Sequence, residues 1–176
     1  MARMITLDPR TSALVLVDLM ERIVGQELAP YSGGVVVARC AAMASAMRKV
    51  GGLVVNVRVE RPNVTAQPPG SGFVADARPQ EGDLEIVKRT WGAFHNTGLD
   101  EELRGRGITT LVIAGIATNF GVEQTARFAD EFGYEVIVLE CGTTGLDAKA
   151  HEFAFEYVFP RLGTVATSAE LLAALG

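Results

Sequence analysis

The chain has little of the chemistry that cysteine, histidine and tryptophan usually supply. It contains two cysteines, two histidines and one tryptophan in 176 residues. Cys40 and Cys141 lie about a hundred residues apart without a CxxC context, so we expect two free thiols in a reducing compartment. Neither His95 nor His151 belongs to a ligand-spaced motif. The sequence therefore predicts no metal site and no cofactor, and both histidines are interpreted as surface or structural residues.

Basic clusters and long apolar runs are also absent. The formal net charge is −5, and the densest basic spots are pairs such as Arg58 with Arg61, which argues against a nucleic-acid partner. No apolar run reaches the roughly 20 residues that cross a bilayer, so no membrane association is expected. Residues 1–10 contain no signal-peptide hydrophobic region. We therefore expect a cytoplasmic protein.

Apolar runs alternate regularly with segments of helical spacing. A hydrophobic fraction of 48% in 176 residues suits one domain that covers residues 1–176. The expected strands are residues 13–17, 53–59, 84–88, 110–115, 134–139 and 164–166. The expected helices are residues 35–50, 99–106, the segment after 119, 147–159 and 168–172, with Thr97, Asp147 and Ser168 as N-caps for three of them. This alternation predicts an α/β three-layer sandwich, in which helices cover both faces of a doubly wound parallel six-stranded sheet.

Residues 60–82 form a connection rich in proline and glycine. Connections of this length inside a compact domain are usually functional or partly mobile. We interpret the segment as a lid over a site or as an interface loop.

Three features with chemical potential fall at the carboxyl ends of expected parallel strands. They are Asp18, Lys88 and the turn Gly115–Gly121. Strand ends of this kind share one edge of a doubly wound sheet, where ligands bind. Taken singly, Asp18 could be a turn former and Lys88 a solvated strand end. Their common placement favours a shared crevice.

The residues of this crevice carry a resemblance to a known family. The run Gly115-Ile116-Ala117-Thr118-Asn119-Phe120-Gly121-Val122-Glu123 resembles the nucleophile loop of the isochorismatase-like (cysteine hydrolase) family. Asp18 after its apolar strand, and Lys88 ahead of Trp91-Gly92-Ala93-Phe94, match the family's other two motifs. The resemblance spans residues 13–172. It implies the strand order 3-2-1-4-5-6 and catalytic positions at Asp18, Lys88 and Gly121.

Gly121 stands where most members of that family carry the catalytic cysteine. Acyl-enzyme chemistry needs a thiolate, so that pathway is closed unless another thiol such as Cys141 substitutes, and an inert Cys141 is the preferred interpretation. Isochorismatases proper carry glycine there and cleave a vinyl ether, which needs a general acid but no nucleophile. Asp18 would be that acid, with a pKa raised by burial, and Lys88 would orient Asp18 and substrate carboxylates. However, that branch usually has an aromatic residue and a histidine where this chain has Ala117 and Asn119.

Three hypotheses remain open for the activity. The first is an isochorismatase-family hydrolase that acts on a small-molecule substrate by acid–base chemistry through Asp18 and Lys88. The second is a cysteine hydrolase that has lost its nucleophile and binds a small molecule or a partner. The third is a structural subunit that assembles with an active relative.

The remaining site expectations concern substrate contacts and assembly. The expected substrate-binding residues are Trp91, Phe94, Ile116, Ala117, Asn119 and Phe120, although Phe94 could be core and Asn119 a helix cap. The resemblance implies a cis peptide at Ile116–Ala117 that turns amides into the crevice. It also implies a homodimer or homotetramer, for which residues 60–82 and the aromatic residues Phe153, Phe155 and Tyr157 are candidate contacts.

Overall fold

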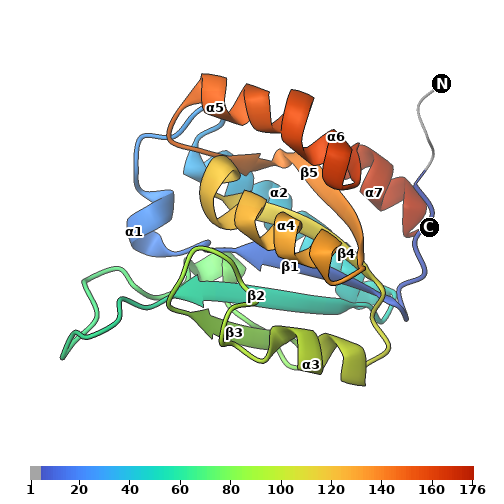
Figure 1. Ribbon diagram of the computed structural model, residues 1–176, viewed down its shortest axis with the longest axis horizontal. Helices are drawn as coiled ribbons and strands as arrows, with labels where there is room; N and C mark the ends of the chain where they lie inside the picture. The colour runs from blue at the N-terminus through green and yellow to red at the C-terminus, as the bar shows by residue number, and fades with distance from the viewer. Residues whose placement is uncertain (1–4) are drawn as a thin grey trace.

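A six-stranded parallel sheet forms the centre of the molecule, with helices on both faces (Figure 1). The computed structural model describes residues 5–176. The strands are β1 Ser12–Val17, β2 Leu53–Val59, β3 Leu84–Lys88, β4 Thr110–Ile116, β5 Glu135–Thr144 and β6 Thr164–Ala166. They lie in the order β3-β2-β1-β4-β5-β6, so the expected α/β class and strand order are confirmed.

Short and long helices connect the strands. They are α1 Glu21–Val24, α2 Gly33–Lys49, α3 Leu99–Gly105, α4 Glu123–Glu131, α5 Ala148–Phe153, α6 Phe159–Leu162 and α7 Ser168–Ala174. A 3₁₀ turn forms at Ala75–Ala77, and π-helical turns form at Thr118–Val122 and Ala154–Val158. None of these helices, within residues 5–176, has the length and apolar character needed to span a bilayer.

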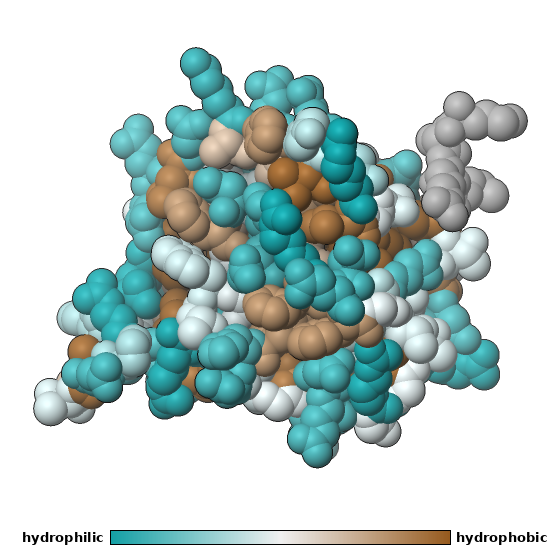
Figure 2. Space-filling view, viewed as in Figure 1, coloured by the Kyte–Doolittle hydropathy of each residue, from teal (hydrophilic) through white to brown (hydrophobic). Residues whose placement is uncertain are grey.

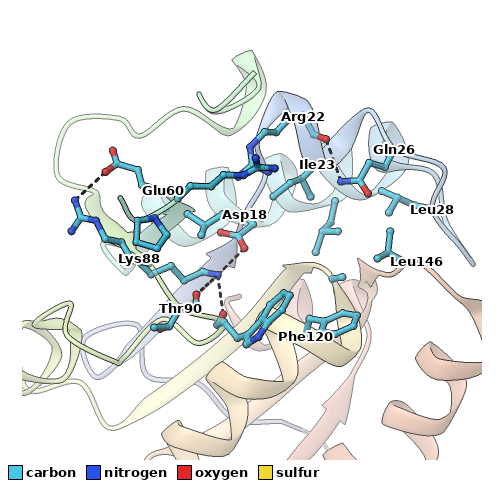
Figure 3. A pocket seen from close by; sticks show the side chains of 18 residues that line it. Asp18, Arg22, Ile23, Gln26, Leu28, Glu60, Lys88, Thr90, Phe120 and Leu146 are labelled. Carbon is cyan, nitrogen blue, oxygen red and sulfur yellow. Dashed lines mark hydrogen bonds and ion pairs between the residues drawn. The ribbon is translucent and has the colours of Figure 1, made fainter. Parts of the chain in front are cut away.

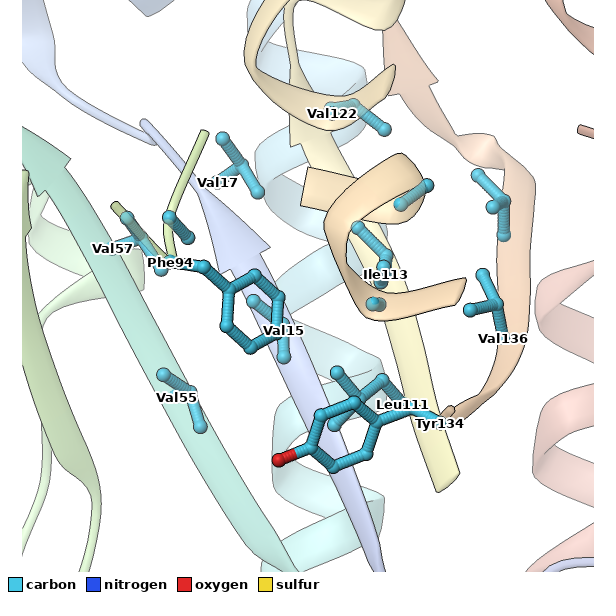
Figure 4. Close-up of a cluster of buried hydrophobic side chains, with 14 of the residues drawn as sticks. Val15, Val17, Val55, Val57, Phe94, Leu111, Ile113, Val122, Tyr134 and Val136 are labelled. Atoms are coloured by element: carbon cyan, nitrogen blue, oxygen red, sulfur yellow. The ribbon is translucent and has the colours of Figure 1, made fainter. Parts of the chain in front are cut away.

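Two apolar cores fill the spaces between the sheet and its helices. Alternate residues of β1 face opposite sides: Val15 and Val17 belong to the core beneath α3, α4 and α6, and Leu14 and Leu16 to the core beneath α2 and α7. Figure 4 shows the first core, where the valines of β1 and β2 pack against Phe94 and Tyr134. β1 and β4 are buried along their whole length, as their unbroken apolar runs indicate.

The fifth strand is longer than the sequence pattern indicates. It was expected to end at residue 139 but continues to Thr144. The pairing with β4 shifts register, from Ile113 opposite Val138 to Gly115 opposite Thr143. A bulge of this kind lets one strand carry extra residues. Polar residues beyond Leu139 therefore stay in the sheet instead of forming a turn.

Two of the three expected helix caps differ in the structure. Asp147 accepts a hydrogen bond from the backbone N–H of Ala150 and caps α5 as expected. The cap of α7 is Thr167, which forms a capping box with Glu170, and Ser168 is the first helical residue. The cap position of α3 is Gly98 instead of Thr97. Both errors are shifts of one residue, within the usual uncertainty of helix boundaries.

The connection of residues 60–82 is tied to α1 by its backbone. The N–H groups of Glu21 and Arg22 donate to the carbonyls of Gly72 and Gly70, at 3.0 and 2.9 Å. Val74 N–H donates to Leu19 O at 3.0 Å. The tip of the loop extends away from the sheet (Figure 1), while its first residues and α1 lie over the strand ends. Together they border the candidate site.

Candidate active site

A pocket of about 580 Å³ opens at the carboxyl ends of β1, β3 and β4. Its lining includes Asp18 from the end of β1, Lys88 from β3 and Gly121 from the turn after β4. The three features that the sequence placed on one edge therefore line the same cavity. Figure 3 shows Asp18 and Lys88 directed at each other on its floor.

Asp18 and Lys88 form a buried ion pair. Lys88 Nζ lies 2.9 Å from Asp18 Oδ2, and the two side chains of Lys88 and Asp18 are 2% and 8% exposed. Lys88 Nζ also donates to the carbonyl oxygens of Thr90, at 3.2 Å, and Trp91, at 2.8 Å. Its three donors are thereby matched by three acceptors. Lys88 thus orients Asp18 but has no N–H left for a substrate carboxylate, which was part of its expected role.

Burial raises the pKa of Asp18 to about 6, and the nearby cations Lys88 and Arg22 oppose that shift only in part. Oδ1 of Asp18 is buried and has no hydrogen-bond partner among the described residues. At pH 7, roughly a tenth of a carboxyl group with such a pKa is protonated, far more than for an ordinary aspartate. Asp18 can therefore exchange a proton with a molecule in the pocket.

The backbone after β4 brings the turn close to Asp18. Gly115 has φ +124°, and a Cβ there would overlap the carbonyl oxygen of Val17, so only glycine fits. The Ile116–Ala117 peptide is cis, as the resemblance implied. The π-helical turn Thr118–Val122 then places Gly121 facing the pocket. A Cβ on Gly121 would lie 3.4 Å from Asp18 Oδ2 and 3.1 Å from Val17 Cγ1, so a short side chain there would contact the ion pair.

An apolar wall completes the pocket. The rings of Trp91 and Phe120 stack with their centroids 4.9 Å apart, and Trp91 is 65% exposed. Ile116 and Ala117 also line the pocket. Phe94 and Asn119 do not: Phe94 packs in the core against Phe132 and Tyr134, and the cap of the π-helical turn is Ala117 instead of Asn119. The structure therefore does not bring these two residues to the pocket that the other expected substrate contacts line.

The sequence analysis missed the three arginines of the pocket, Arg22, Arg61 and Arg89. Four cations line the cavity; Lys88 pairs with Asp18 and Arg89 with Glu60. Arg22 and Arg61 form no ion pair with the described residues, and Nε of Arg22 is buried without a hydrogen-bond partner. No periodic pattern in the sequence indicates that the side chain of Arg22 reaches the pocket. Its orientation depends on α1 and on the loop that holds α1.

The two cysteines and the two histidines lie outside this pocket. Cys141 Sγ accepts a hydrogen bond from Ser168 N–H at 3.0 Å, and burial raises the pKa of Cys40 to about 12. His151 is buried and its Nδ1 lies 2.7 Å from Thr118 Oγ1, whereas His95 is exposed. Across residues 5–176, no group of three or more His, Cys, Asp or Glu side chains is arranged to hold a metal ion.

The doubly wound sheet, with an acid, a lysine and a strand-to-helix turn at one edge, defines a class of α/β proteins with a crevice at the strand ends. Comparison with known proteins narrows that class. The family model for the isochorismatase domain matches residues 12–170, and the chain belongs to the isochorismatase family.

Full-length relatives agree with this assignment. The chain is 35% identical to an uncharacterized isochorismatase family protein, YecD, of Escherichia coli O157:H7, over 98% of this chain and 100% of the relative. It is 36% identical to another uncharacterized isochorismatase family protein, YwoC, of Bacillus subtilis, over 98% of each. A shorter match, 42% identical over 48% of this chain and 34% of the relative, is to ureidoacrylate amidohydrolase RutB of Variovorax paradoxus.

Solved structures of the family superpose closely. An isochorismatase family protein from Burkholderia thailandensis has a TM-score of 0.89 at 41% identity, with 97% of each chain covered. An N-carbamoylsarcosine amidase from Thermoplasma acidophilum has a TM-score of 0.78 at 26% identity, with 90% of this chain and 96% of that chain covered. The fold of this protein is therefore that of isochorismatase-family hydrolases.

Proposed function

We propose that this protein is an isochorismatase-family hydrolase that works by acid–base chemistry through Asp18, without a cysteine nucleophile. The observation that carries the proposal is the state of Asp18. Its carboxyl group is buried, its pKa is raised to about 6, and its Oδ1 has no hydrogen-bond partner within residues 5–176. These are the properties of a group that donates and accepts a proton at near-neutral pH.

Hydrolysis of a vinyl ether is a reaction that a single titrating carboxyl group can catalyse. Protonated Asp18 transfers its proton to the terminal carbon of the enol ether, which leaves an oxocarbenium ion at the other carbon. Water adds to that carbon and returns a proton to the Asp18 carboxylate. The resulting hemiketal separates into a ketone and an alcohol. The whole sequence needs one titrating group and one water molecule, and none of its steps needs a side chain at Gly121.

Lys88 is assigned to positioning Asp18 and Arg22 to binding the substrate's anionic group. All three donors of Lys88 have partners inside the protein. Arg22 lines the pocket, and its buried Nε has no hydrogen-bond partner in the part of the chain that the structure describes. Guanidinium groups bind carboxylates in a bidentate fashion. The stacked rings of Trp91 and Phe120 offer an apolar surface for the body of such a substrate. A compact carboxylate with an enol-ether arm matches this lining.

The test is turnover of isochorismate, followed by pyruvate release, across a range of pH. If Asp18 is the acid, turnover rises as the pH falls toward about 6 and levels off below. Asp18→Asn should abolish turnover, and Arg22→Gln should raise KM about tenfold or more with a smaller change in kcat. The exposed Glu131 offers a matched control, Glu131→Gln. Turnover that survives Asp18→Asn would exclude this mechanism.

A second candidate is a family member that has lost its nucleophile and retains binding. It is favoured by the short similarity to an amidohydrolase and by the geometry at Gly121, where an added Cβ would lie 3.4 Å from Asp18 Oδ2. Gly121→Cys would then create hydrolysis of amide or ureido substrates that the wild-type protein binds but does not cleave. If Gly121→Cys gains no such activity and the wild type cleaves vinyl ethers, the first candidate stands.

A further inference from the structure

A second cavity lies away from the pocket of Asp18. It measures about 440 Å³ and is lined by Pro30, Tyr31, Glu140, Ala148, His151, Glu152, Phe155 and Glu156. None of these residues lines the first pocket. The end of β5, the start of α5 and the loop between α1 and α2 meet here (Figure 1). An antiparallel bridge joins Ala29 of that loop to Gly145, the residue that follows β5.

The charge of this cavity has one sign. Glu140, Glu152 and Glu156 line it, and its described lining includes no lysine or arginine. The nearby cation Arg39 does not line the cavity: its guanidinium lies over the ring of Tyr31, 4.5 Å from the centroid, and donates to the carbonyl oxygen of Cys141. The aromatic residues Tyr31 and Phe155 form part of the wall. Carboxylates beside aromatic rings are a setting in which organic cations bind.

His151 supplies an unused polar atom in the same cavity. The side chain is 5% exposed, and its ring lies between Tyr31 and Phe155, with centroid distances of 6.2 and 4.7 Å. Nδ1 has a partner in Thr118 Oγ1 at 2.7 Å, but Nε2 is buried without any hydrogen bond among the described residues. A buried polar atom of this kind requires an explanation.

Nε2 and Glu140 are spaced to share one ligand. Nε2 lies 3.5 Å from Glu140 Oε1, without hydrogen-bond geometry. Oε1 already accepts from the hydroxyl of Tyr31 at 2.8 Å, which holds the carboxylate in place. Burial lowers the pKa of His151 against the opposing effect of Glu140, and the lowered pKa favours the neutral ring. When Nδ1–H donates to Thr118, Nε2 is an acceptor, and a single ammonium can donate to Nε2 and to Glu140 together.

We propose that this cavity is a second ligand site, which binds a small organic cation, a protonated amine with an apolar or aromatic body. The ammonium lies beside the 3.5 Å gap that separates His151 Nε2 from Glu140 Oε1, within hydrogen-bond distance of both atoms, and the body packs against Phe155 and Tyr31. Glu152 and Glu156 on α5 and the turn after it add negative charge at the rim. The site is independent of the proposed reaction at Asp18.

The chain has a separate spectroscopic reporter for each cavity. Its single tryptophan, Trp91, lies at the first pocket, and of its two histidines only His151 lies at the second. The experiment titrates benzylamine into the wild-type protein, with benzyl alcohol as the neutral ligand of matched shape. The imidazole ¹⁵N resonances of His151 and His95 and the fluorescence of Trp91 are followed together.

Benzylamine should shift the His151 ring resonances saturably, and it should leave His95 and the Trp91 fluorescence unchanged. Benzyl alcohol should produce no saturable shift. Glu140→Gln should weaken binding about tenfold or more, because a hydrogen bond to a charged group is lost. Glu152→Gln, at an exposed position, should weaken it less and keeps the test valid if the first variant fails to fold. Glu131→Gln on α4 is the control and should bind like wild type.

The opposite results would overturn the proposal. These are a response of Trp91 alone, equal shifts with benzyl alcohol, no saturable change at His151 in the millimolar range, or affinity that survives both Glu140→Gln and Glu152→Gln.

Discussion

Two opposing effects act on the pKa of the Asp18 carboxyl group. Desolvation favours its neutral form, and Lys88 at 2.9 Å favours its charged form. Desolvation is the larger effect, so its pKa is raised from 3.8 to about 6. A carboxyl group whose pKa is higher in the folded state binds more protons there than in the unfolded chain at intermediate pH. Its contribution to stability therefore increases as the pH falls through about 6.

This sign leads to a measurable prediction about stability. The free energy of unfolding of the wild type, relative to that of Asp18→Asn, should increase as the pH falls from about 6 to 3.8, because only the wild type takes up the extra proton. Urea denaturation at several pH values measures the difference. Asp130→Asn, at an exposed position on α4, should show no such trend. If the difference in unfolding free energy instead increases with rising pH, the attraction of Lys88 outweighs desolvation and lowers the pKa of Asp18.

At the scale of residues, sequence reasoning found the side chains that are fixed by strand ends. Asp18, Lys88 and Gly121 could be placed because parallel strands deliver their carboxyl ends to one edge. Phe94 and Asn119 were misplaced because the direction of a side chain within a loop or a turn has no periodic signal. Arg22 was missed for the same reason: its guanidinium reaches the pocket only because residues 70–74 hold α1 in place.

At the scale of elements, the close approach of β4 to β1 depends on the absence of a side chain at Gly115. A methyl group there would overlap the backbone of Val17 at its nitrogen and its carbonyl group. We expect Gly115→Ala to cost about 3 kcal/mol or more of unfolding free energy, since neither backbone can move without breaking the sheet.

Gly105→Ala is the matched control for that substitution. Gly105 is the last residue of α3, and a Cβ there would meet nothing within 4 Å. Alanine is the better helix former, so Gly105→Ala should leave stability unchanged or raise it by up to about 1 kcal/mol. Equal effects of the two substitutions in urea denaturation would contradict the overlap at Gly115.

The bounds of a strand could be predicted where a single apolar pattern runs along its whole length. β1, β2, β3 and β6 begin and end within about one residue of the expected bounds. The end of β5 was not predictable, because residues 140–144 remain in the sheet only through the register shift against β4. The helix expected at residues 147–159 is interrupted by the π-helical turn Ala154–Val158 and ends at Leu162.

At the scale of the whole molecule, exposed apolar side chains gather on the helical face drawn in Figure 2, over α4 and along α5 to α6. Phe153 and Tyr157 stack at 5.1 Å and are 58% and 53% exposed. Phe155, which was expected to share this surface, is buried at 8% exposure. Stacked, exposed aromatic rings are typical of residues that a partner covers.

We expect this surface to mediate self-association. Light scattering coupled to gel filtration should give a multiple of the 18.7 kDa chain mass. The double substitution Phe153→Ser and Tyr157→Ser should shift the protein toward monomer. Leu172→Ser, at a position 42% exposed on α7, should not. A monomeric wild type, or a double variant with unchanged mass, would place the contact elsewhere or exclude it.

The bare backbone at Gly121 also has a consequence at the level of the gene. Glycine codons that end in T or C become cysteine codons through a single G-to-T change. From such a codon, one point mutation places a thiol beside Asp18, because a Cβ at this position would lie 3.4 Å from Oδ2. Under selection for amide hydrolysis, the Gly121→Cys variant can arise in one step, without an intermediate substitution at this position. With such a codon, the chain is one nucleotide away from the residue that its resemblance to the cysteine hydrolases leads us to expect.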